Sequence, residues 1–279
     1  LMLAPTGSGK TLAAFLACID RVMFSPVPEK KQRCRVLYVS PLKALAVDVE
    51  RNLRAPLVGI GLAAQARGDD FHEPEIAIRT GDTPASERAR FARRPADILI
   101  STPESLYLLL TSTARRTLRH VETVIVDEVH AVAATKRGAH LALSLERLDQ
   151  LTDKPAQRIG LSATVRPPEE VARFLSGQRR TTIVAPAAAK TFDLSVQVPV
   201  PDMANLENNT IWPDVEHRIV DLIEAHNSSI VFANSRRLAE RLTSRLNEIS
   251  AERSEPTARE GSDAVPDAHN RHVGGGAPA

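Results

Sequence analysis

Hydrophobic positions in the first 185 residues alternate between short apolar runs and amphipathic stretches, a pattern typical of a parallel sheet with crossover helices. The short runs are β-branched or leucine-rich and predict strands at residues 36–40, 75–79, 98–101, 124–126, 159–161 and 182–184. Runs that are apolar on both faces favour a sheet buried between helices. The amphipathic stretches predict those helices at residues 11–22, 45–53, 104–110, 141–151 and 168–175. The pattern therefore predicts an α/β fold.

The pattern changes near residue 190, where we place a domain boundary. Residues 185–190 are small, polar or proline-containing, and residues 193–200 have an extended pattern. Beyond them, apolar spacing predicts a helix around residues 215–223, a buried strand at 230–233, and a second helix through Leu238, Leu242 and Leu246. After Ile249 the composition turns to Ser, Glu, Arg, Gly, Pro and Ala, which predicts a disordered segment. We therefore predict three parts: a first lobe at 1–190, the start of a second at 191–249, and a disordered tail at 250–279.

Composition adds only a few limits to this picture. A chain of 279 residues suits two α/β lobes, and 43% hydrophobic with 25% charged residues is ordinary globular usage. The net charge is only +2, so any phosphate-binding surface must be local. We find neither a signal sequence nor an apolar run near the roughly 20 residues that span a bilayer, and therefore expect a cytoplasmic protein with no membrane partner. Cys18 and Cys34 lack the spacing of a zinc site or a disulfide framework.

The strongest local signal is the sequence APTGSGKT, which runs from Ala4 to Thr11 and leads directly into a predicted helix. It has the form of a phosphate loop in which Ala4 replaces the usual first glycine. The glycines leave room for backbone N–H groups to surround phosphate oxygens, assisted by the positive end of the helix. Lys10 can reach the β- and γ-phosphates of ATP, and the Thr11 hydroxyl can ligate the bridging Mg²⁺. The predicted ATP-binding residues are Thr6, Gly7, Ser8, Gly9, Lys10 and Thr11; a glycine-rich turn with a chance lysine is the alternative.

Two adjacent carboxylates, Asp127 and Glu128, follow the apolar strand predicted at residues 124–126. Side chains in that position emerge at the carboxyl edge of a parallel sheet, where a phosphate loop holds its nucleotide. Asp127 can hold Mg²⁺ through water, and Glu128 can orient and deprotonate the attacking water. We predict Lys10, Asp127 and Glu128 as the catalytic residues. Two carboxylates after a strand are also typical of a solvated turn, so this prediction depends on the phosphate loop upstream.

Six segments occur in the order of helicase motifs I, Ia, Ic, II, III and IV: APTGSGKT, SPLKAL, STPESL, DEVH, SAT and IVFANSRR. Over residues 1–249 the chain thus resembles a superfamily 2 helicase of the DEAD/DEAH type, specifically the large helicase-related (Lhr) family. The resemblance implies a RecA-like ATP-binding lobe with a parallel sheet and flanking helices, an incomplete second RecA-like lobe and a disordered tail. It also implies ATP hydrolysis with Mg²⁺, 3′-to-5′ movement on single-stranded DNA, unwinding of duplexes or DNA/RNA hybrids, and a role in DNA repair.

The resemblance also assigns residues to a bound strand, where small hydroxyl and backbone N–H groups suit phosphate contacts without base readout. The implied strand contacts are Ser40, Pro41, Leu42, Lys43, Thr80, Gly81, Asp82, Thr102, Pro103 and Glu104, with Ser235, Arg236 and Arg237 in the second lobe. His130, Ser162, Ala163 and Thr164 would couple the nucleotide to these contacts. For the loop residues of the first lobe the alternative interpretation is helix capping. His130 would alternatively be a structural histidine, and Arg236 with Arg237 a surface arginine pair.

The family pattern breaks after motif IV, because motifs V and VI with their arginine finger do not follow. An arginine finger is worth about 10³ to 10⁵ in rate, so we expect the chain to bind ATP far better than it hydrolyses it. We expect it to be an N-terminal fragment of a larger enzyme. The alternatives are a catalytically silent nucleic-acid-binding fragment and a phosphate-loop ATPase of another class. DNA or RNA preference and oligomeric state stay open.

Overall fold

The computed structural model describes residues 1–186, 193–200, 202–204, 206 and 210–254. The chain divides into two compact units, Leu1–Lys190 and Thr191–Ala279. The tail predicted to be disordered lies outside the described residues from 255 onward. In the described part of the chain no helix is both long and apolar enough to cross a membrane.

The first unit is built on a parallel sheet of six strands in the order β1-β6-β5-β2-β4-β3. The strands are β1 (Met2–Leu3), β2 (Val36–Val39), β3 (Ile76–Arg79), β4 (Ile98–Ser101), β5 (Thr123–Val126) and β6 (Gln157–Ser162). They confirm five of the predicted strands. The strand predicted at residues 182–184 is wrong, because only Val184 forms a bridge, with Met2. Its neighbour β1 has only two residues, so little backbone is available for a longer pairing.

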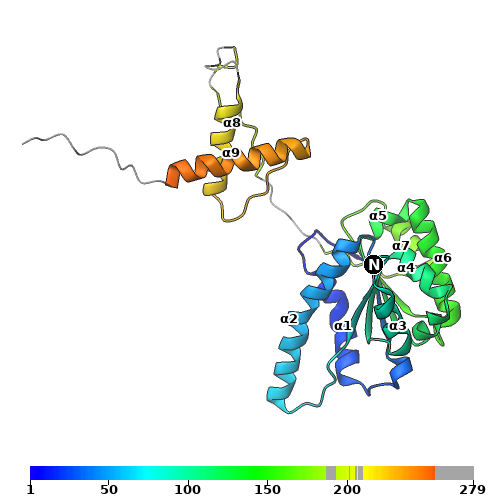
Figure 1. The fold of residues 1–279 in the computed structure, drawn as a ribbon. Coiled ribbons are helices and arrows are strands. Elements are labelled where there is room, and N and C mark those ends of the chain that lie inside the picture. The colour runs from blue at the N-terminus through cyan, green and yellow to red at the C-terminus, as the bar shows by residue number, and fades with distance from the viewer. Residues whose placement is uncertain (187–192, 201, 205, 207–209, 255–279) are drawn as a thin grey trace, which may run out of the picture. The chain divides into compact units, whose positions relative to one another are not determined.

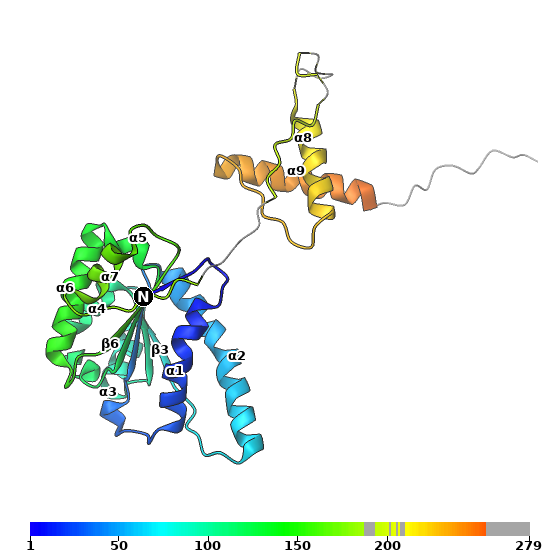
Figure 2. The ribbon, with the colours of Figure 1, turned by 180° about the vertical axis from the view of Figure 1, so that it is seen from behind.

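Helices cover both faces of this sheet, with α1 and α2 on one side and α4, α6 and α7 on the other (Figures 1 and 2). The helical elements are α1 (Lys10–Phe24), α2 (Lys43–Arg67), α3 (Ala85–Arg93), α4 (Pro103–Leu110), α5 (Val129–Ala133), α6 (Lys136–Leu151) and α7 (Pro168–Ser176), with 3₁₀ turns η1 (Lys30–Gln32) and η2 (Thr113–Leu118). All five predicted helices are present, whereas α3 and α5 were not predicted. Each of these two buries only one or two residues and therefore leaves a weak periodic signal.

Helix α2 is much longer than the predicted segment 45–53, because it continues through Pro56 to Arg67. A proline normally signals a helix break, since it removes one backbone hydrogen bond. Beyond it, Leu57 and Ile60 pack against the core cluster beneath α2. That packing supports the extra turns until Gly68, whose positive φ of 74° ends the helix.

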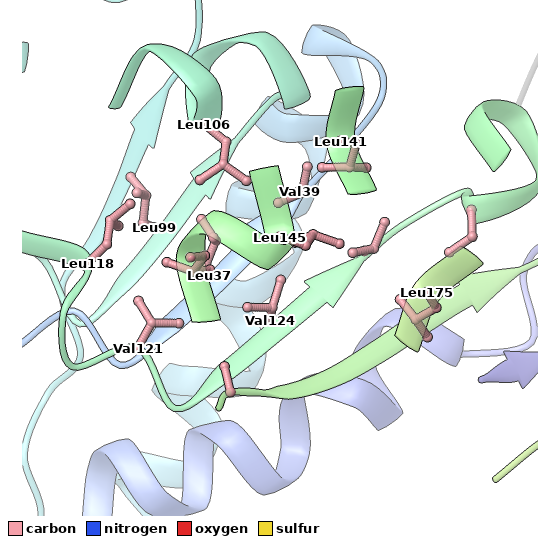
Figure 3. Packing of buried hydrophobic residues seen from close by; sticks show 14 of the residues in the cluster. Leu37, Val39, Leu99, Leu106, Leu118, Val121, Val124, Leu141, Leu145 and Leu175 are labelled. Atoms are coloured by element: carbon pink, nitrogen blue, oxygen red, sulfur yellow. The ribbon is translucent and has the colours of Figure 1, made fainter. Parts of the chain in front are cut away.

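Alternate residues of the strands enter two separate hydrophobic clusters, as the period of a β-strand requires. In β2, Val36 and Tyr38 face the cluster under α1 and α2, whereas Leu37 and Val39 face the cluster under α4 and α6. Figure 3 shows the second cluster, in which Leu145 of α6 lies over the strands. Both clusters fix the sheet from its two faces, and so they also fix the edge from which the loops emerge.

The second unit contains α8 (Trp212–Glu224) and α9 (Arg236–Ser254) among its described residues. Arg253 of α9 forms ion pairs with Asp221 and Glu224 of α8, at 2.9 and 3.0 Å. Both predicted helices are present, and α9 continues to Ser254 rather than ending at Ile249. Its last turn is held by these ion pairs rather than by apolar residues, which is why composition did not predict it.

The strand predicted at residues 230–233 is wrong, because these residues are not in a strand and are largely exposed. Ile230 and Phe232 are 81% and 90% exposed. A strand needs a neighbour to receive its backbone hydrogen bonds, and the described residues of this unit include no other strand.

Candidate functional site at the carboxyl edge of the sheet

The strand order divides the loops at the carboxyl edge into two neighbouring groups. The β1–β6–β5 half carries the loops at residues 4–11, 162–164 and 127–130. The β2–β4–β3 half carries the loops at residues 40–43, 102–104 and 80–82. Backbone hydrogen bonds connect each of two loops to the end of the neighbouring strand: Ala4 N–H to the Ser162 carbonyl of β6 at 3.2 Å, and Asp127 N–H to the Val39 carbonyl of β2 at 2.9 Å. The predicted ATP-binding residues and the predicted contacts to a bound DNA strand in this unit therefore lie at one edge of the sheet, on different halves of it.

The phosphate loop presents backbone donors beside open space, although the Ser8 N–H donates to the Pro5 carbonyl at 3.3 Å. Gly7 and Gly9 have φ values of 82° and 81°, which strongly favour glycine, although a Cβ at either position would meet nothing within 4 Å. Gly9 precedes α1 without any side-chain cap, so the first N–H groups of the helix remain available to an anion. Thr6 and Ser8 are exposed beside them. This combination of open space and unsatisfied donors fits a phosphate chain.

The Lys10 side chain lies back along this loop. Its ammonium donates to the carbonyls of Ala4 and Pro5 at 2.6 and 2.8 Å, while the adjacent Thr11 is half-buried. Among the described residues no group of three or more His, Cys, Asp or Glu side chains could hold a metal ion. Thr11 and Asp127 still suit Mg²⁺, which usually takes most of its ligands from water and phosphate.

Asp127 is buried, and both of its carboxylate oxygens are engaged by the protein. The Glu128 N–H donates to Asp127 Oδ1 at 2.8 Å, and the Tyr38 hydroxyl donates to Oδ2. Tyr38 is fully buried and stacks on Phe15 of α1, with ring centroids 5.4 Å apart. Burial, with the nearby Asp127 charge, raises the pKa of Tyr38, so its hydroxyl stays a donor. Sequence reasoning missed Tyr38; the available signal was a hydroxyl in an otherwise apolar strand, since such a group needs a partner.

Glu128 adopts φ 45° and ψ 46°, a left-handed conformation that non-glycine residues seldom adopt. Strain of this kind is commonly retained at functional sites. His130 Nδ1 lies 3.3 Å from Glu128 Oε2 and 3.1 Å from Ser162 Oγ. Its distance to the Ala163 nitrogen is 3.4 Å. A single ring nitrogen thus brings the DEVH and SAT segments together, while Thr164 is exposed.

The β2–β4–β3 half combines buried polar groups with exposed ion pairs. Ser40, Pro41, Thr80, Thr102 and Pro103 are buried, whereas Leu42, Lys43, Gly81, Asp82 and Glu104 are exposed. Thr102 caps α4 by accepting from the Ser105 N–H at 3.4 Å. Lys43 pairs with Asp82 at 2.8 Å, and Glu104 pairs with Arg137. Capping, the alternative interpretation of these loops, is therefore present at Thr102.

The remaining predicted strand contacts lie in the second unit. Ser235 accepts from the Leu238 N–H at 3.2 Å and so caps the start of α9. Arg236 and Arg237 open that helix and are exposed.

Comparison with known proteins gives the family. The model of the DEAD/DEAH box helicase family matches residues 1–174. The Lhr helicase/probable uracil glycosylase of Mycolicibacterium smegmatis is 71% identical over all of this chain, and the Lhr helicase/uracil glycosylase of Escherichia coli is 53% identical over 91% of it. The chain spans 18% of the length of each.

A solved structure supports the fold at high identity. The Mycobacterium smegmatis helicase Lhr, bound to single-stranded DNA and AMP-PNP, matches with 74% identity and a TM-score of 0.77. The match covers 91% of this chain and 32% of that one. The RecA-like fold and the Lhr resemblance predicted from the motifs are both confirmed. The chain therefore belongs to the DEAD/DEAH box helicase family.

Proposed function

We propose that this chain is the ATP-binding part of a motor that moves along single-stranded DNA. The observation that carries the proposal is the shared sheet edge, where the phosphate loop, the DEVH segment and the SAT segment lie on neighbouring strands. The single-stranded DNA and AMP-PNP bound to the similar Lhr helicase support it.

On the β1–β6–β5 half, the proposed roles follow from chemistry and position. Backbone N–H groups from Thr6 to Thr11 hold the phosphates, and the Lys10 ammonium exchanges its two carbonyl partners for phosphate oxygens. Thr11, and Asp127 through water, would hold Mg²⁺, and the ion would supply positive charge that neutralises the phosphates. Glu128 orients the attacking water and accepts its proton.

His130 is the proposed link between hydrolysis and movement. Its Nδ1 contacts both Glu128 and Ser162, so a change at the γ-phosphate position alters the partners of this one imidazole nitrogen. Ser162 is the last residue of β6, which lies between the phosphate-loop strand and the DEVH strand. Ala163 and Thr164 continue the same loop and would transmit this change to the residues that contact the DNA strand.

On the β2–β4–β3 half, the loops at residues 40–43, 80–82 and 102–104 would follow the strand backbone. Ser235, Arg236 and Arg237 would supply contacts from the second unit. The family resemblance adds 3′-to-5′ movement, DNA/RNA hybrid unwinding and a role in repair. Unwinding of duplexes that carry a 3′ or a 5′ single-stranded tail would test the direction.

The test of the proposed function is strand-stimulated ATP hydrolysis. We expect the chain to bind Mg²⁺-ATP and single-stranded DNA, and hydrolysis that rises on adding the strand supports a motor. Loss of that stimulated rate in Lys10→Ala and Glu128→Gln would tie it to this site. Binding of both ligands with a hydrolysis rate that the DNA strand does not raise would favour a catalytically silent nucleic-acid-binding fragment. A chain with no affinity for Mg²⁺-ATP would contradict the proposal.

A further inference from the structure

An arginine that no sequence motif singled out lies beside the β2–β4–β3 half. Arg137 is the second residue of α6, and its guanidinium makes a two-point ion pair with Glu104, with Nη2 to Oε2 at 2.9 Å. Glu104 is in the first turn of α4, directly after the Thr102–Pro103 loop. The side chains of Arg137 and Glu104 are 38% and 54% exposed, so both are open to solvent.

The backbone that carries Arg137 is held firmly in place. Thr135 caps α6 by accepting from the Gly138 N–H at 3.0 Å, and its hydroxyl donates to the Val132 carbonyl at 2.7 Å. A Cβ at Gly138 would come 2.0 Å from that same carbonyl oxygen, so α6 begins in direct contact with the end of α5. Arg137 therefore occupies a fixed position between the helix that follows the DEVH carboxylates and the start of α4.

The chemistry of the pair favours Arg137 over Glu104 as a partner of a nucleic-acid backbone. A carboxylate only accepts hydrogen bonds and repels phosphate, whereas a guanidinium binds phosphate with the same two-point geometry that it uses for a carboxylate. The Arg137 hydrogen bond lowers the pKa of Glu104, which keeps that carboxylate charged and paired. Exposed ion pairs contribute little to stability and are easily exchanged.

We propose that Arg137 contacts a phosphate of the bound single strand, and that Glu104 is the counter-charge which it releases on binding. The inference rests on the proposed function and changes the role of Glu104 from a strand contact to a competitor of the strand. Lys43 and Asp82 form a second exposed ion pair at this edge of the sheet, between the loops at residues 40–43 and 80–82, and it likewise joins a cation to a carboxylate.

The experiment measures the affinity of the 279-residue chain for a fluorescein-labelled oligothymidylate by anisotropy over a range of salt concentrations. The variants are Arg137→Gln, Glu104→Gln and the double variant. The matched control is Arg119→Gln, which breaks an exposed pair with Asp153 of 3.0 Å near the amino end of β5, at the opposite edge of the sheet. Thermal unfolding of every variant reports its folding.

Arg137→Gln is expected to weaken binding and to reduce the slope of log affinity against log salt by about 0.7, the value for one phosphate contact on a single strand. Glu104→Gln should bind more tightly than wild type, because it frees the guanidinium. The double variant should resemble Arg137→Gln, and Arg119→Gln should resemble wild type.

A purely structural ion pair predicts a different pattern. Arg137→Gln and Glu104→Gln would then lower thermal stability alike and leave the salt slope unchanged, which would overturn the inference while the wild-type chain still bound the strand. Weaker binding by Glu104→Gln than by wild type would also overturn it. Failure of the wild-type chain to bind the strand at all would overturn the proposed function and the inference together.

Discussion

The two halves of the sheet edge differ in how they hold their polar groups. In the β1–β6–β5 half two polar side chains, Asp127 and Ser162, are buried and bonded to the protein, at 8% and 0% exposure. Glu128 and His130 beside them are 30% and 35% exposed. In the β2–β4–β3 half the charged side chains are exposed, with Lys43 at 55% and Asp82 at 76%. Fixed buried groups suit a reaction, which needs preorganised geometry. Exposed ion pairs suit a strand that must be bound and released repeatedly, because water screens them and phosphate competes for them.

The largest expected effect is that of Glu128→Gln on hydrolysis. Because the amide cannot accept the proton of the attacking water, we expect the strand-stimulated rate of the complete enzyme, with motifs V and VI, to fall about 10²- to 10⁴-fold with nucleotide affinity preserved. Phosphate release and binding of a fluorescent ATP analogue measure the two quantities separately. Equal hydrolysis by wild type and variant would remove Glu128 from its assigned role.

Tyr38→Phe should sharpen the contrast between the halves, because it removes one hydrogen bond to Asp127 and keeps the ring that stacks on Phe15. Asp127 Oδ2 then has no donor, and the carboxylate is less firmly oriented. The Mg²⁺ concentration for half-maximal hydrolysis should therefore rise about tenfold, as expected for loss of a hydrogen bond to a charged group. Strand affinity without nucleotide should not change. An unaltered Mg²⁺ dependence would show that Tyr38 does not position Asp127.

Thr102→Ala is expected to have a smaller effect, confined to the β2–β4–β3 half. The hydroxyl caps α4, so its loss should cost about 1 kcal/mol of unfolding free energy and weaken strand binding a few-fold. Thr102→Ser keeps the hydroxyl and serves as the control for both measurements. Wild-type strand affinity in Thr102→Ala, with the stability loss present, would assign Thr102 to capping alone.

Sequence patterns predicted the elements whose signal is local. Strand β4 and helix α4 have compact apolar runs with clear ends, and the phosphate loop carries its own spacing. The strand at residues 230–233 failed because apolar character predicts burial, whereas strand formation also requires a neighbour. Tyr38 and Arg137 were missed because their partners, Asp127 and Glu104, are distant in sequence and meet only through the sheet order and the contact between α4 and α6.

The most direct test that the sheet edge has a nucleotide half and a DNA-strand half is to measure both affinities for each of two variants, Lys10→Ala and Lys43→Gln. Nucleotide affinity is measured without strand, and strand affinity without nucleotide, each against wild type. We predict that Lys10→Ala loses affinity for Mg²⁺-ATP alone and Lys43→Gln for the strand alone, by about tenfold or less for one phosphate contact. Similar losses of both affinities in either variant would contradict the division of the edge into a nucleotide half and a strand half.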